Sequence, residues 1–202
     1  MTRSEALVNV LLWGGAVLAI AGLWWPNWIE ALVGQQSPFL DLALFRTPVI
    51  SYLGYIILWI ACIIVVGLKG AASDYGAPGW VGLALVAIAI ISSVMAHLGA
   101  SPSIILLLFT IAAFLASLLI YWTMEKMVEI KRMAKRTVYG VNFVALVLGI
   151  SAVVAISSSI GVALTYATAA VYMLTWLLIA VSVLPSHYRY MMEKRKRTLG
   201  SS

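Results

Sequence analysis

Six long apolar stretches contain no Asp, Glu, Lys or Arg, and each is close to the length that an α-helix needs to cross a bilayer. A hydrocarbon core of about 30 Å requires roughly 20 helical residues. A helix also satisfies its backbone hydrogen bonds internally, as lipid demands. The sequence therefore predicts an all-α, polytopic integral membrane protein, a single bundle of six transmembrane helices over residues 6–25, 49–68, 80–98, 102–124, 141–164 and 165–184.

The composition leaves no room for a separate soluble domain. Of the 202 residues, 63% are hydrophobic and only 10% are charged, whereas soluble domains carry about 25% charged residues. We expect residues 1–188 to form the transmembrane domain and residues 189–202 to form a basic cytoplasmic tail. The first stretch ends in Trp24-Trp25-Pro26 instead of a small-residue cleavage site, so it is expected to remain as a span.

The basic residues predict the orientation in a multi-pass cell-membrane protein. Short cytoplasmic loops carry an excess of Lys and Arg. Of the 13 Lys and Arg residues, only Arg46 falls in a connection on the outer face, which leaves twelve for the inner side. Both termini are therefore predicted to be cytoplasmic.

The connection over residues 26–48 is the longest on the outer side. It holds both outer carboxylates and the one outer cation, and its apolar residues are spaced as on an amphipathic segment. Three interpretations stay open, namely an interfacial helix, a lid over the bundle, and a docking surface for a neighbouring subunit. The residues that would serve as lid or docking segment are Trp28, Glu30, Asp41 and Arg46.

The connection over residues 125–140 is predicted to extend the fourth helix and, with the tail, to form a basic cytoplasmic face. Such a face attracts anionic lipid headgroups, and the alternative is an acidic protein partner. The chain has no separate folded domain that could recognise the groove of a nucleic acid, so no nucleic acid partner is expected. The face consists of Lys131, Arg132, Lys135, Arg136, Lys194, Arg195, Lys196 and Arg197.

Two aromatic pairs recur at i,i+4 near the middle of a span: Tyr55 with Trp59, and Tyr172 with Trp176. Each pair occupies one helix face, and buried Trp N–H and Tyr O–H groups require partners. The four residues are candidates for a pocket that takes an aromatic or lipophilic ligand. Helix packing inside the bundle is the more common explanation.

Small residues recur at four-residue spacing in several spans, which allows helix backbones to approach closely in lipid. These pairs predict tight packing for the first, fourth and fifth spans. The pairs are Gly15 and Ala19, Ala112 and Ala116, Ala145 and Gly149, Ser151 and Ala155, and Ser159 and Ala163.

The sequence lacks the residue sets that common enzymes need. It has no phosphate-binding loop, no HExxH or GxSxG motif and no paired carboxylates inside a span, so we expect no catalytic residues. His97 and His187 are predicted on opposite faces and Cys62 stands alone, so neither a metal nor a cofactor is expected. The low Asn, Gln and Cys content leans towards a thermophilic source.

The predicted architecture resembles the substrate-binding membrane component of an energy-coupling-factor vitamin transporter. The resemblance consists of six spans, cytoplasmic termini and a long first outer connection. That family carries an AxxxA signature in its first helix. In this chain, Ala16 and Ala19 are three residues apart and Ile20 occupies the position of the second alanine.

Two functions remain as predictions. The first is a non-catalytic membrane subunit or scaffold of a larger membrane complex, which associates with other subunits or with itself. The alternative is a transporter or substrate-binding component for a small lipophilic or aromatic molecule. Transporter spans are often broken by Pro or Gly near the midplane, whereas every Pro here falls at a span edge or in a connection. That placement favours the first function.

Overall fold

The computed structural model describes residues 3–23, 48–68, 76–125 and 132–182, which form six helices and, within these ranges, no strand. The all-α prediction is therefore confirmed for this part of the chain. The helices are α1 (Arg3–Ala21), α3 (Val49–Leu68), α4 (Gly76–His97), α5 (Pro102–Glu125), α6 (Arg132–Ala155) and α7 (Ser159–Ser182).

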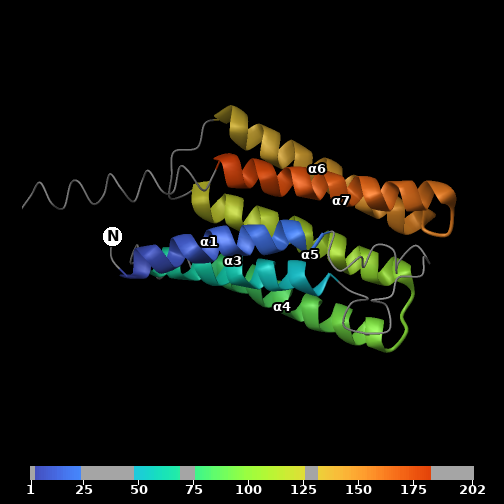
Figure 1. Ribbon diagram of the computed structural model, residues 1–202, viewed down its shortest axis with the longest axis horizontal. Coiled ribbons are helices and arrows are strands. Elements are labelled where there is room, and N and C mark those ends of the chain that lie inside the picture. The colour runs from blue at the N-terminus through green and yellow to red at the C-terminus, as the bar shows by residue number, and fades with distance from the viewer. Residues whose placement is uncertain (1–2, 24–47, 69–75, 126–131, 183–202) are drawn as a thin grey trace, which may run out of the picture.

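The helices lie roughly along one axis, each antiparallel to the next in sequence (Figure 1). Helices α6 and α7 form one closely packed pair, and α1 and α3 form another. Helix α5 lies between them and contacts α3, α4, α6 and α7. The bundle therefore has α5 at its centre and the two pairs on either side.

Within the described ranges, the charged residues lie at one end of the bundle. Helices α1 and α6 begin there and α5 and α7 end there (Figure 1). Every Asp, Glu, Lys and Arg in the described ranges lies within the terminal turns at this end, which we call the charged end: Arg3, Glu5, Glu125, Arg132, Lys135 and Arg136. The opposite end carries the α4–α5 and α6–α7 turns, and we call it the turn end.

Four described helices are long and apolar enough to cross a membrane. They are Gly79–His97, Pro102–Tyr121, Arg136–Ala155 and Ser159–Val181. Helices α1 and α3 contribute shorter apolar segments, Ala6–Ala21 and Val49–Ile64. Together these helices indicate a membrane protein.

The turn between α6 and α7 lies at residues 156–158, earlier than the boundary at 164–165 that the sequence suggested. The Ser158 hydroxyl accepts a hydrogen bond from the Gly161 backbone N–H at 3.1 Å. Ser158 is thus the N-cap of α7, since a Ser oxygen satisfies a donor that the helix start leaves unpaired. The cap sets the boundary between α6 and α7. Hydropathy does not detect this boundary, because the residues before and after the turn are both apolar.

Helix α6 begins at Arg132, so residues 132–140 belong to α6 and do not extend α5, which ends at Glu125. The sequence placed this region on the fourth helix. Val138 and Asn142 are buried in the same row of α6 as Ala145. Continuous packing of this face against the bundle explains why the helix starts early.

The α4–α5 turn uses a left-handed glycine. Gly99 has a φ of 77°, and the Ala100 N–H donates to the Met95 carbonyl at 2.8 Å. This is a Schellman cap, in which Gly avoids the strain that a Cβ would introduce. The Ser101 carbonyl then accepts the Ile104 N–H at 3.1 Å as α5 begins.

Helices α1 and α3 meet at small residues. Gly54 lies so close to α1 that a Cβ added to it would stand 2.6 Å from the Ala19 nitrogen and 2.8 Å from the Gly15 carbonyl oxygen. The Ser51 hydroxyl donates to the Ala19 carbonyl at 3.2 Å. Close approach of backbones is the main source of helix affinity in lipid, where burial in protein offers no hydrophobic gain.

Replacing Gly54 by Ala should destabilise the bundle, because the new methyl group meets backbone atoms that cannot move independently. We expect a loss of about 1–3 kcal/mol, measured as reduced thermal stability in detergent. Gly14 provides the matched control, since nothing lies within 4 Å of a Cβ built there. Gly14→Ala should be neutral or stabilising by up to about 1 kcal/mol. Equal stability of the two variants would contradict the close α1–α3 contact.

Candidate functional site

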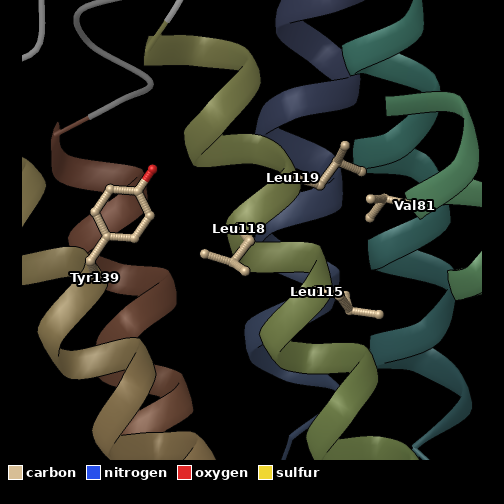
Figure 2. A pocket seen from close by; sticks show the side chains of 5 residues that line it. All are labelled: Val81, Leu115, Leu118, Leu119 and Tyr139. Carbon is tan, nitrogen blue, oxygen red and sulfur yellow. The ribbon is translucent and has the colours of Figure 1, made fainter. Parts of the chain in front are cut away.

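An open cavity of about 290 Å³ lies near the charged end. Leu115, Leu118 and Leu119 of α5 line it together with Val81 of α4 and Tyr139 of α6 (Figure 2). Tyr121 packs edge-on against Tyr139, with ring centroids 5.0 Å apart. The lining is almost wholly apolar, so this cavity suits a hydrocarbon group.

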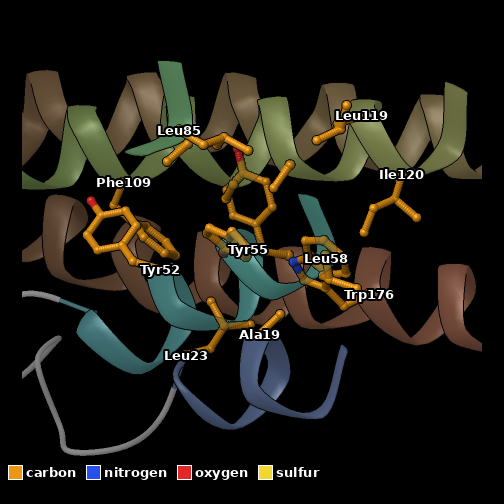
Figure 3. Close-up of a cluster of buried hydrophobic side chains, with 14 of the residues drawn as sticks. Ala19, Leu23, Tyr52, Tyr55, Leu58, Leu85, Phe109, Leu119, Ile120 and Trp176 are labelled. Atoms are coloured by element: carbon orange, nitrogen blue, oxygen red, sulfur yellow. The ribbon is translucent and has the colours of Figure 1, made fainter. Parts of the chain in front are cut away.

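A second feature is the aromatic cluster at the centre of the bundle (Figure 3). The ring of Tyr55 on α3 stacks on the indole of Trp176 on α7, with centroids 5.5 Å apart and an interplanar angle of 18°. Both side chains are fully buried. The two candidates from different spans therefore meet face to face.

Three further rings extend this cluster. Tyr52 packs edge-on against Tyr55 and Phe109, and Phe109 packs in the same way against Tyr172. Edge-to-face geometry is favourable because the positive ring edge meets the negative ring face. The cluster thus joins α3, α5 and α7 through continuous aromatic contact.

Hydrogen bonds from two of these tyrosines cross between helices. The Tyr172 hydroxyl donates to the Thr110 carbonyl at 2.8 Å, and the Tyr52 hydroxyl donates to the Ser92 hydroxyl at 3.1 Å. Bonds of this kind are commonly worth below about 1 kcal/mol each in a membrane. They fix the orientation of the rings as well as adding stability.

Trp59 on α3 packs towards α4. Its indole packs against Gly82 of α4 so closely that any Cβ at position 82 would overlap it. The structure thus brings Tyr55, Tyr172 and Trp176 together and places Trp59 in the α3–α4 contact. None of the four lines the cavity described above, and a ligand pocket between them stays a prediction.

Three buried polar atoms in and beside the cluster make no hydrogen bond of good geometry within the described residues. They are the Tyr55 hydroxyl, the Thr110 hydroxyl and the Trp176 indole nitrogen. Ser51 and Trp176 are polar neighbours of the Tyr55 hydroxyl. A buried polar group without a partner costs about 1–3 kcal/mol, so the nearness of the Tyr55 hydroxyl to Trp176 and Ser51 lowers the cost of burying it.

Sequence reasoning overlooked Thr110, Tyr52 and Phe109 in this cluster. Thr110 is the one polar residue in the run from Ile104 to Ala116. A lone hydroxyl in an apolar run is a signal for an interior position, because it would gain nothing from facing lipid. Tyr52 also precedes Tyr55 by three residues, the spacing that places two side chains on one helix face.

Some of the remaining candidates lie in the described ranges and the others lie outside them. In the described ranges, Arg132, Lys135 and Arg136 lie in the first turns of α6, and Arg136 is exposed. His97 is exposed at the turn end and Cys62 is buried. Within the described ranges no three His, Cys, Asp or Glu residues gather as a metal site would require. Outside these ranges lie Trp28, Glu30, Asp41, Arg46, Lys131, Lys194, Arg195, Lys196 and Arg197.

No protein-family model, curated protein sequence or solved structure matches this chain.

Replacing Trp176 by Ala should strongly destabilise the protein, because it removes a fully buried indole and leaves a cavity. We expect a loss of about 3–5 kcal/mol, measured by thermal unfolding in detergent. Trp13 on α1, which is 45% exposed, is the control, and Trp13→Ala should change the stability far less. If both variants unfold at the same temperature, Trp176 does not have the packing role described here.

Proposed function

We propose that the chain is a multi-pass cell-membrane protein with six spans and cytoplasmic termini. Helices α1 and α3 have 19 and 20 residues, and 20 residues reach about 30 Å at 1.5 Å per residue. The described Lys and Arg residues gather at the charged end, where α1 begins and α7 ends. This arrangement supports a cytoplasmic location of that end under the positive-inside rule.

Within the membrane, the proposed role is that of a non-catalytic subunit or scaffold in a larger complex. The observation that carries this proposal is the outward face of α7. Ser159, Ala163 and Ala170 are exposed on one side of that helix, with Ala167 partly exposed beside them. These small residues lie in the half of α7 nearest the turn end, while Leu174, Leu177 and Val181 are exposed towards the charged end. A patch of small residues is typical of contacts between membrane helices.

The contrast with the other small residues strengthens this interpretation. Ala112, Ala116, Ala145 and Gly149 are buried between helices of the bundle, and the side chain of Thr110 occupies the space beside Gly149. Ser151 on α6, by comparison, is exposed near the same turn as Ser159 and Ala163. Helices α6 and α7 therefore each expose small residues near the turn end, beside the exposed Val154 and Ile160.

The proposed neighbours are other membrane subunits or a second copy of the chain. The basic residues of the charged end would contact anionic lipid headgroups. A thermophilic source remains a prediction from composition alone.

A carrier or binding component for a small lipophilic or aromatic molecule is the second candidate. The buried polar atoms of Tyr55, Thr110 and Trp176, which make no hydrogen bond of good geometry within the described residues, favour it. The close stacking of Tyr55 on Trp176 favours the subunit role instead, because the space between these rings is already filled. A ligand that stabilises the purified wild-type chain would support the carrier.

Replacing Ala163 by Trp should weaken assembly, because a large ring on the small-residue face prevents close approach of a partner helix. Overpacking costs about 1–3 kcal/mol, so recovery of companions should fall about ten-fold. The measurement is native electrophoresis with mass spectrometry after mild detergent extraction.

Ala87→Trp is the matched control, since Ala87 is exposed on α4 among large apolar residues. It should leave the set of companions unchanged. A wild-type chain that extracts as a lone monomer would contradict the subunit role, as would an Ala163→Trp variant with undiminished companions.

The orientation predicts which engineered cysteines are accessible from outside the cell. In a Cys62→Ala background, Ser101→Cys in the α4–α5 turn should react with a membrane-impermeant maleimide on intact cells. Ser202→Cys should react only after permeabilisation. The reverse pattern would show that the charged end faces outwards.

A further inference from the structure

The cavity near the charged end is a groove along the outside of α5. Leu115, Leu118 and Leu119 form its floor. Tyr139 on α6 and Val81 on α4 form walls on the two sides of α5 (Figure 2). Because α4 and α6 flank α5 here, an elongated molecule would contact three helices at once.

The floor continues towards the turn end as an exposed apolar stripe. Ile104, Leu107 and Ile111 are exposed at successive turns of α5, and their spacing places them on the same helix face as Leu115 and Leu118. A chain-like molecule that enters at the charged end could therefore lie along α5 towards the middle of the bundle. The shape fits a hydrocarbon chain.

The lining argues against a helix as the occupant. Interfaces between membrane helices are enriched in small residues that let backbones approach. The five lining residues are three Leu, one Val and one Tyr, and the small residues of the bundle lie elsewhere. A methylene chain, which needs only apolar contact, suits this surface better than a second helix.

The mouth of the groove lies beside positive charge. Arg136 is exposed one turn before Tyr139 on α6, and Arg132 and Lys135 belong to the same first turns. Among the described residues of α4, α5 and α6, the one carboxylate is Glu125, at the end of α5. Trp80, next to Val81, is 75% exposed, as is common for Trp at the headgroup level.

We propose that this groove binds one acyl chain of an anionic phospholipid, with the phosphate of its headgroup beside Arg136. Basic sites between helix ends are suited to anionic headgroups. Each methylene buried against Leu115, Leu118 and Leu119 adds to the binding, and the cation selects the headgroup. The proposal depends on the membrane location of the chain and not on its role as a subunit.

The test is native mass spectrometry of the full chain, released from nanodiscs that contain equal amounts of phosphatidylglycerol and phosphatidylcholine with the same acyl chains. The wild type should retain one phosphatidylglycerol in preference to phosphatidylcholine. Leu118→Trp fills the groove and should abolish retention of both lipids. Leu83→Trp, at an exposed Leu on the other side of α4 from Val81, should retain lipid as the wild type does.

The charge is tested separately at an exposed position that does not endanger folding. Arg136→Gln should reduce the preference for phosphatidylglycerol about five-fold, as expected for one cation near a membrane surface, and Arg136→Lys should keep most of it. Equal retention by Leu118→Trp and Leu83→Trp would overturn the groove, and an unchanged headgroup preference in Arg136→Gln would overturn the headgroup site. A wild-type dimer that Leu118→Trp dissociates would show that a second copy occupies the groove and would likewise overturn the proposal.

Discussion

The packing of α5 against four other helices is the contact on which the rest of the bundle depends. In lipid, helices gain no hydrophobic energy by association, so they are held by close packing and by hydrogen bonds between them. Helix α5 provides both. Its Ala112 and Ala116 are buried, and its Thr110 and Phe114 carbonyls accept hydrogen bonds from Tyr172 and Asn142. The α6–α7 pair is joined to the remaining helices largely through these contacts.

Some polar side chains inside the bundle form hydrogen bonds between helices, and others form them within their own helix. Ser51 bonds to α1, Tyr52 to α4 and Tyr172 to α5, while several Ser and Thr hydroxyls return to carbonyls of their own helix, as Thr175 does to Val171. The hydroxyl of Tyr55 and the indole nitrogen of Trp176 stand apart from this pattern. Their contact is a ring stack, which gains its energy from buried area and dispersion.

The two surfaces proposed for interactions differ in the residues that form them. The half of α7 nearest the turn end exposes Ser159, Ala163 and Ala170, which permit another helix backbone to come close. The groove on α5 is lined by Leu, Val and Tyr. Their side chains are too large for a second helix backbone to come close, but they suit a flexible hydrocarbon chain. The two proposals are therefore separable, because a Trp at position 163 and a Trp at position 118 would disturb different partners.

The sequence by itself determined the all-α class, the four long apolar helices and the ends of α3 and α5, because the bilayer excludes charge from the spans and Pro48 and Pro102 mark helix starts. It also singled out Tyr55, Tyr172 and Trp176. Only the tertiary structure decided that Trp59 faces Gly82, that Thr110 joins the aromatic cluster, and that some small-residue pairs are buried while Ser159 and Ala163 are exposed. In a helix that is apolar on every side, hydropathy has no periodicity to distinguish the face towards lipid from the face towards protein. The rotation of each helix is set by side-chain shape and by hydrogen bonds between helices, which act only when the helices meet.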